Sequence, residues 1–199
     1  AKPVRASNPT QNSPSRRFNS TEYLETWSKT GTFPKIHDAI GAMMRRHGLG
    51  ASCVDLCGNT GLLATRIISE FDVPCIIVEG DAAAITAARK YSIPAKHHQL
   101  MIGPSTYDAF FDILSGADVD TLVARRCISE LFTGPDDPNG AVFSKRLAEV
   151  GVTKVFLQGR QPVRAATHPI PTIQEEIRLF SASFQLVGCV KQCAHLTKG

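Results

Sequence analysis

The amino-acid sequence predicts an α/β fold in which a doubly wound, mostly parallel sheet carries helices on both faces. From residue 52 onward, short apolar runs alternate with amphipathic stretches of helical length, which is typical of parallel sheets. At 199 residues and 43% hydrophobic content, the chain suits one such domain with a sizeable core. The expected strands are 52–57, 74–79, 98–102, 121–124, 154–157 and 185–190.

The segment 21–50, before the first strand, is expected to form a short helical cap. Thr21 suits the N-cap of a first helix, and the stretch 28–32 reads as the loop that follows it. Pro34 suits the first turn of a second helix, which Gly48 ends. Together with residues 51–199 as the core, this cap would complete a single domain spanning 21–199.

Helices are also expected between the strands of the core. Their apolar residues recur at intervals of three and four, and Asp81 suits the N-cap of the second of them. Only nine residues follow Val190, too few for another strand with its turn, so the strand at 185–190 is expected to be the last. The expected core helices are 61–71, 82–91, 107–114, 142–150 and 173–184.

Basic charge is concentrated at the beginning of the chain. Residues 1–20 hold four basic side chains and no acid, and they are rich in Ser, Asn and Pro, which is typical of a disordered arm. The whole chain has 22 Lys and Arg against 18 Asp and Glu, so 18 of each sign remain beyond the arm. This balance argues against duplex DNA as a partner, whereas the arm is a candidate contact for RNA or a protein.

The six cysteines lie mostly in apolar runs, where a thiol acts as a small hydrophobe. Cys189, Cys193 and His195 lack the second ligand pair that a zinc site requires, so no metal is predicted. We find no secretory signal and no apolar run of about 18 residues. A cytoplasmic protein without a membrane segment is therefore expected.

The stretch 53–63 carries the strongest functional signal. Its apolar run contains Asp55 and leads into a turn with Gly58 and Gly61, after which an amphipathic helix begins. Eighteen residues past Gly61, a second apolar run ends in Glu79. A strand, a glycine-containing turn, a helix and a second strand with an acid at its tip are typical of a nucleotide-binding βαβ unit.

This unit resembles the first two motifs of class I S-adenosylmethionine-dependent methyltransferases. The resemblance covers residues 21–195 as architecture, with 119–124 similar to the family's fourth strand, whose tip faces the transferable methyl group. It implies S-adenosyl-L-methionine as the cofactor and Glu79 as the acid that binds both ribose hydroxyls. The cofactor-binding residues that it implies are Asp55, Cys57, Gly58, Asn59, Gly61, Glu79, Gly80 and Ala124.

The turn departs from the family pattern, which usually has glycine at three alternate positions. Cys57 and Asn59 take the first two of these positions, and Gly61 keeps the third. One alternative is therefore a binding or scaffold protein that kept the fold and lost turnover. A second alternative is an NAD-binding Rossmann enzyme, although the chain supplies G-x-x-G rather than G-x-G-x-x-G.

No motif identifies the acceptor of the methyl group, and a small molecule, an RNA and a protein all remain candidates. The fourth strand tip lacks the sequences found in methyltransferases that act on exocyclic amines or on cytosine C5. Adjacent arginines at this tip suit a phosphate or carboxylate on a substrate, and a histidine suits a proton acceptor. Lys29 is a candidate for approaching the cofactor, and His97 and His98 are further candidate bases. The candidate catalytic residues are Arg125, Arg126, Glu130 and His168.

Overall fold

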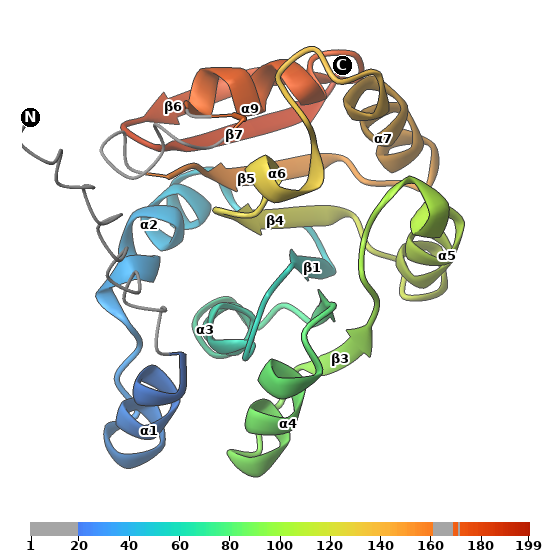
Figure 1. Cartoon of the computed structure of the whole chain (residues 1–199). Helices are drawn as coiled ribbons and strands as arrows, with labels where there is room; N and C mark the ends of the chain where they lie inside the picture. Colours follow the sequence, from blue (N-terminus) through green and yellow to red (C-terminus); the bar gives the residue numbers. More distant parts are fainter. Residues whose placement is uncertain (1–19, 161–168, 171) are drawn as a thin grey trace, which may run out of the picture.

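The computed structural model describes residues 20–160, 169–170 and 172–199, which contain one seven-stranded sheet with helices on both faces (Figure 1). The strand order is β3-β2-β1-β4-β5-β7-β6. Five strands run parallel, whereas β7 pairs antiparallel with both β5 and β6. The strands are β1 (Cys53–Leu56), β2 (Cys75–Glu79), β3 (Lys96–Gln99), β4 (Thr121–Arg125), β5 (Lys154–Gln158), β6 (Phe184–Val190) and β7 (Cys193–Lys198).

The helices alternate with the strands along the chain. In the described ranges, side chains cap three of them, because Asp81, Asp137 and Thr172 each accept a hydrogen bond from a backbone N–H of the first turn. The helices are α1 (Ser20–Thr30), η1 (Lys35–His37), α2 (Asp38–His47), α3 (Leu62–Phe71), α4 (Ala82–Lys90), η2 (Pro104–Thr106), α5 (Tyr107–Gly116), α6 (Ile128–Leu131), α7 (Pro138–Glu149) and α9 (Ile173–Phe180). None of the helices in the described part of the chain has the length and apolar character needed to cross a membrane.

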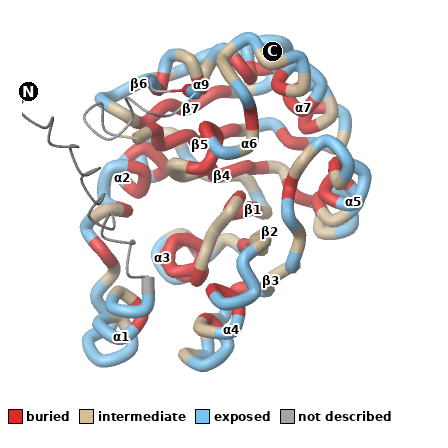
Figure 2. The backbone as a smooth tube through the Cα atoms, in the orientation of Figure 1, coloured by how far each residue is buried: buried red, intermediate tan, exposed pale blue. Residues whose placement is uncertain are grey.

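The central strands are apolar and buried on both faces of the sheet (Figure 2), whereas the edge strands β3 and β6 are largely exposed. One face packs against α2 and α3, which contribute Met44 and Ile67 to its core. The other face packs against α5, α7 and α9, where Phe143 touches the rings of five other aromatic residues. Successive residues of a strand point to opposite faces of the sheet, so each side chain at a strand tip also lies on one face or the other.

The C-terminal end of the sheet differs from the expectation of a single last strand at 185–190. That expectation was wrong, because β6 is joined to β7 through only Lys191 and Gln192, and six residues then suffice for a strand. Lys191 has φ 54°, in the left-handed region that a tight hairpin turn requires. Cys193 to Leu196 are buried between β5 and β6.

Other boundaries were also misplaced. The helix expected at 142–150 begins at Pro138, and the helix expected at 173–184 ends at Phe180. The third strand lies at Lys96–Gln99 rather than 98–102, because an edge strand tolerates polar side chains and the apolar run only follows it. The first helix continues to Thr30 through part of the expected loop, and the Gly31 N–H still donates to the Trp27 carbonyl. The strands at 52–57, 74–79, 121–124 and 154–157 are confirmed to within two residues.

Candidate functional site

The turn after β1 keeps a left-handed backbone at the three positions where the resemblance places glycine. Cys57 and Asn59 both have φ 52°, and Gly61 has φ 81°. Non-glycine residues rarely adopt this conformation, and it costs of order 1–3 kcal/mol each. The turn therefore has the glycine-type backbone path although two of its glycines are replaced.

Gly58 lies between these positions because no larger residue fits there. A Cβ at Gly58 would lie 2.7 Å from Asp55 Oδ2 and 2.8 Å from Ile77 Cγ2. Both distances are below any normal van der Waals contact. The close packing of Gly58 thus places the turn directly over the end of β1 and its carboxylate.

Glu79, at the tip of β2, connects the turn to the next loop. Its Oε2 accepts a hydrogen bond from the Asn59 N–H at 2.7 Å, and its Oε1 accepts one from the Asp81 N–H at 2.8 Å. Each carboxylate oxygen has capacity for a second hydrogen bond. Glu79 therefore shapes the turn and still presents acceptors at the sheet edge, where a ribose would lie in a nucleotide-binding fold.

Asp55 is almost completely buried beneath the turn, with 1% of its surface exposed. Burial raises the pKa of its carboxyl group from 3.8 to about 7, although the Arg125 charge and a hydrogen bond from the Ala64 backbone act in the opposite direction. Oδ2 has no hydrogen-bond partner in the protein. Such a carboxyl group is suited to meet a positively charged or hydrogen-bond-donating ligand.

A pocket lies above this turn, on the face of the sheet that carries α2 and α3. Its floor is formed by Asp55 and the turn, and η1 covers it from the other side. The register of the strands brings Arg125 to the same edge, because Leu56 pairs with Ala124 in β4. The lining residues are Tyr23, Pro34, Ile36, His37, Asp55, Cys57, Gly58, Asn59, Thr60, Leu62, Leu63 and Arg125.

The segment around η1 is held over the pocket by contacts on two sides. Arg125 Nε and Gln158 Nε2 both donate to the Ile36 carbonyl oxygen, at 3.4 and 3.5 Å. On the other side, buried Arg66 of α3 forms ion pairs with Asp38 and Glu70 at 2.8 Å. These contacts position η1 relative to the turn after β1.

Four side chains that line the pocket have buried polar atoms without a hydrogen-bond partner. These atoms are His37 Nδ1, Asp55 Oδ2, Asn59 Oδ1 and Arg125 Nη2. Leaving one such group unsatisfied costs about 1–3 kcal/mol, so native proteins usually retain them only where a ligand, water or function uses them. Their convergence on one pocket indicates a binding site for a polar ligand.

His37 is kept neutral in this pocket. Burial, together with the positive charges of Arg125, Arg66 and Arg126, lowers the pKa of its imidazole from 6.5 to about 3. At neutral pH His37 therefore offers one N–H donor and one nitrogen acceptor without adding positive charge.

An apolar side chain flanks the site beyond the tip of β2. Met101 follows β3, is 73% exposed, and lies beside Gly80. A Cβ at Gly80 would lie 2.7 Å from Met101 Cε, so a side chain there would displace the methionine. An exposed thioether next to Glu79 is suited to pack against a flat ring.

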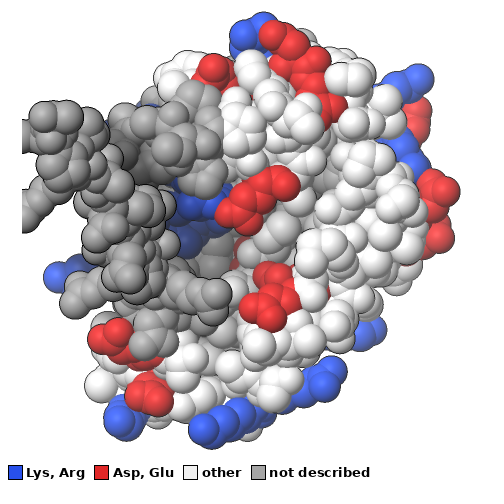
Figure 3. Space-filling view, viewed as in Figure 1, with Lys and Arg blue, Asp and Glu red and all other residues white. Residues whose placement is uncertain are grey.

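The candidate catalytic residues are only partly brought together. Arg125 lines the pocket, whereas Arg126, with φ 57°, turns the chain and donates its N–H to the Gln158 carbonyl. Glu130 pairs with Arg160, whose Nε also donates to Ser129 Oγ. Figure 3 shows acidic and basic side chains next to one another near the middle of the side of the molecule that it views. His168 lies outside the described residues.

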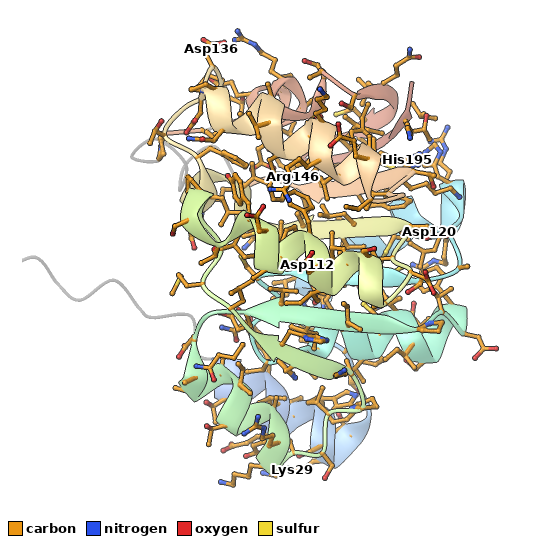
Figure 4. The ribbon with its side chains drawn as sticks, turned by 90° about the vertical axis from the view of Figure 1, so that its right-hand side faces the viewer. Lys29, Asp112, Asp120, Asp136, Arg146 and His195 are labelled. Atoms are coloured by element: carbon orange, nitrogen blue, oxygen red, sulfur yellow. The ribbon has the colours of Figure 1, made fainter. Side chains whose placement is uncertain are left out.

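The remaining predicted site residues have varied positions. Ala124 is buried in β4 between Leu56 and Leu157. His97 Nε2 lies 3.2 Å from the Asn59 carbonyl oxygen and so supports the turn. Lys29 is exposed on α1 and is not among the residues that line the pocket (Figure 4).

Sequence reasoning missed the cap residues Tyr23, Ile36 and His37, as well as Met101. They follow no motif and reach the site only through tertiary packing. One signal was available for Met101, because it is an apolar residue in the loop after a strand, at the ligand-binding edge of the predicted sheet.

Similarity to known proteins is confined to three-dimensional structure. No protein-family model and no curated protein matches this chain. A structure of the glycopeptide N-methyltransferase MtfA with S-adenosyl-L-homocysteine matches with a TM-score of 0.59 and 11% identity, covering 88% of this chain and 96% of that one. The fold is that of class I S-adenosylmethionine-dependent methyltransferases.

Other solved structures are similar over most of their length. Magnesium protoporphyrin IX methyltransferase ChlM from Synechocystis PCC 6803, with bound S-adenosylmethionine, has a TM-score of 0.56 and 7% identity over 93% of this chain and 86% of that one. A structure from work on the conversion of a disulfide bond into a thioacetal group during echinomycin biosynthesis has a TM-score of 0.56 and 12% identity, covering 80% of this chain and 81% of that one. At these identities the likeness establishes the fold alone.

Proposed function

We propose that this protein is an S-adenosyl-L-methionine-dependent methyltransferase that binds its cofactor over the turn 57–61. The observation that carries the proposal is the convergence of unsatisfied buried polar atoms on one pocket directly above that turn. The left-handed backbone at Cys57 and Asn59 supports it, because this is the path that glycine would take at the same positions.

The residues present fit the cofactor at both of its ends. Glu79 would accept hydrogen bonds from the ribose hydroxyls, and Met101 with Gly80 would flank the adenine ring. Asp55, through Oδ2, would meet the ammonium group of the amino-acid part. The sulfonium supplies an electrophilic methyl group, so the protein's tasks are to position the acceptor and to receive a proton when the acceptor is neutral.

We propose a small molecule as the acceptor rather than duplex DNA. The chain beyond residue 20 carries equal numbers of basic and acidic side chains, so it lacks the excess of positive charge that duplex binding requires. The solved structures of this fold include enzymes named for a glycopeptide and for a porphyrin, so the fold by itself selects no acceptor class.

Calorimetric titration with S-adenosyl-L-methionine, S-adenosyl-L-homocysteine and NAD tests the cofactor. The wild-type protein should bind both sulfur compounds and not NAD. Glu79→Ala should bind them at least tenfold more weakly, through loss of hydrogen bonds to a charged group. Asp112→Ala, which changes an exposed acid on α5 (Figure 4), is the matched control and should bind like the wild type.

The same titration separates the alternatives. Binding of NAD in preference to the sulfur compounds would favour a Rossmann enzyme and contradict the proposal. If S-adenosyl-L-methionine binds but radiolabelled methyl groups reach no acceptor in a broad panel, a scaffold protein with a retained cofactor site becomes the better description. Absence of binding to any of the three ligands would reject the methyltransferase proposal.

A further inference from the structure

Two thiols meet at the tip of β1, beside the turn 57–61. Cys127, the N-cap residue of α6, donates from Sγ to the Leu56 carbonyl oxygen at 3.3 Å, and Cys57 is the next residue along the chain. Cys57 packs against the apolar core that contains Cys127. A hydrogen bond between the two thiols, together with burial, raises the pKa of Cys127 well above its ordinary value of 9.0. The two side chains are therefore in contact, and both thiols are free.

The two thiols differ in their access to solvent. Cys57 is half-buried and lines the pocket above the turn, so a small molecule that enters the pocket can reach its sulfur. Cys127 is only 3% exposed, and its raised pKa makes it the less reactive thiol. An accessible thiol next to a buried one is typical of cysteine pairs in which the first is oxidised and the second then resolves it to a disulfide.

The other cysteines among the described residues do not combine these features. Cys53 and Cys75 are neighbours in the register of β1 and β2, but both are buried. Cys189 is exposed, yet it pairs with Ala194 across the hairpin, so it points to the opposite face of the sheet from Cys193. The pair at the turn is thus the one that an oxidant can reach and that can close.

The backbone at Cys57 would suit glycine better than cysteine. Its φ of 52° lies in the left-handed region, where a side chain costs free energy that glycine avoids. A side chain retained at such a cost is expected to have a use. The polar contact of this side chain is with the Cys127 thiol, which again indicates that the two sulfurs act together.

We propose that Cys57 and Cys127 form a reversible disulfide in the presence of hydrogen peroxide, and that this bond weakens ligand binding in the pocket above the turn. The Cys57 sulfur attacks one peroxide oxygen, the O–O bond breaks, and a sulfenic acid and one water result. The Cys127 sulfur then attacks the Cys57 sulfur, the S–O bond breaks, and the leaving hydroxide takes the Cys127 proton to form a second water. The two sulfurs together lose two electrons, which the peroxide gains.

The disulfide would change the shape of the turn. Its sulfur atoms lie about 2.05 Å apart, which is closer than two thiols in hydrogen-bond contact, so closing the bond draws Cys57 toward the start of α6. Gly58 has no space in which to adjust, because it already packs against Asp55 and Ile77 too closely for a Cβ. The turn then leaves its present conformation, and the lining of the pocket changes with it. The bond forms without a cofactor, so only its effect on binding rests on the proposed function.

Peptide mapping tests whether the bond forms. The full chain is treated with hydrogen peroxide, its remaining thiols are alkylated, and it is digested without a reductant for mass spectrometry. A peptide that links Cys57 to Cys127 should appear, and dithiothreitol should remove it. Cys53 and Cys75 are buried and should stay reduced in the same sample. In Cys127→Ala the sulfenic acid has no partner, so dimedone should label Cys57 more strongly than in the wild type.

Calorimetry with S-adenosyl-L-homocysteine measures the effect on binding. Oxidation of the wild type should lower its affinity by roughly tenfold or more, equivalent to the loss of about one hydrogen bond to a charged group, and dithiothreitol should restore it. Cys57→Gly removes the thiol and suits the left-handed backbone, so peroxide should not change the affinity of that variant. Cys189→Ser removes the exposed cysteine on the edge strand β6 and should respond to peroxide like the wild type. If Cys127→Ala fails to fold, Cys57→Gly still decides, because it should give no linked peptide.

Two outcomes overturn the inference while leaving the proposed function intact. If exposed Cys189 is oxidised and no peptide links Cys57 to Cys127, the pair does not form the bond. If the linked peptide forms and the affinity for S-adenosyl-L-homocysteine is unchanged, the bond does not control the pocket. If the reduced wild type does not bind S-adenosyl-L-homocysteine, the proposed function fails and control of binding fails with it, whatever the peptide map shows.

Discussion

Replacing Asp55 with asparagine should make the protein more stable at neutral and alkaline pH. The folded carboxyl group has a pKa of about 7 against 3.8 without burial. Below pH 4 it is protonated in both the folded and unfolded states. Between pH 4 and 7 the unfolded chain releases the proton but the folded protein retains it, so folding loses about 1.4 kcal/mol per pH unit. Above pH 7 the accumulated cost is about 4 kcal/mol, and asparagine avoids it.

Urea unfolding of wild type and Asp55→Asn at pH 5 and pH 8 measures this cost. The stability difference should grow by about 3 kcal/mol in favour of the variant between the two pH values, while effects of the amide that do not depend on pH cancel. A difference that stays constant with pH would refute the raised pKa. In parallel, the variant should bind S-adenosyl-L-homocysteine more weakly, because an amide attracts an ammonium group less than a carboxylate does. Higher stability with lower affinity is the expected signature of a residue kept for binding.

Three other changes test the fold and the cap. Cys57→Val should lower the free energy of unfolding by about 2 kcal/mol or more, because a β-branched residue fits φ 52° poorly. Cys57→Gly should change the same free energy by less than about 1 kcal/mol. Equal effects of the two substitutions in urea unfolding would contradict the left-handed backbone at Cys57. Phe143→Ala should lower the free energy of unfolding by about 3–5 kcal/mol, since the ring is fully buried among other aromatic rings. A loss below about 1 kcal/mol in urea unfolding would argue against this packing. Asp38→Asn removes one ion-pair partner of buried Arg66. It should weaken S-adenosyl-L-homocysteine binding several-fold in calorimetry, because η1 is then held less firmly. Unchanged affinity would show that the Asp38–Arg66 ion pair does not position the cap.

The parts of the fold that depend on local pattern could be predicted from the sequence. The central strands are buried on both faces and read as continuous apolar runs, so β1, β2, β4 and β5 were found in place. The edge strand β3 is polar, and β7 follows a turn of two residues, so neither has the pattern that identified the others. Their positions are determined by the neighbours with which they pair.

The candidate site divides in a similar way. Asp55, the turn and Glu79 lie in one βαβ unit whose spacing is visible in the sequence, and the structure places Asp55, Cys57, Gly58 and Asn59 around one pocket. His37 comes from a segment with no motif, and it meets the turn only because α2 packs on the sheet. The left-handed conformation of Cys57 could not be read from its side chain, which gives no indication of positive φ.

The antiparallel end of the sheet has a consequence for the order in which the protein can fold during synthesis. Strand β7 lies between β5 and β6, although it is made after both. While β7 is still inside the ribosome, β6 has no neighbour to pair with, and β5 lacks one of its two partners. The strands β1 to β4, which include the nucleotide-type βαβ unit, pair with one another and are all made before β5, β6 and β7. We therefore expect this part of the sheet to form first on the ribosome, with closure of the rest waiting until about residue 198 has emerged.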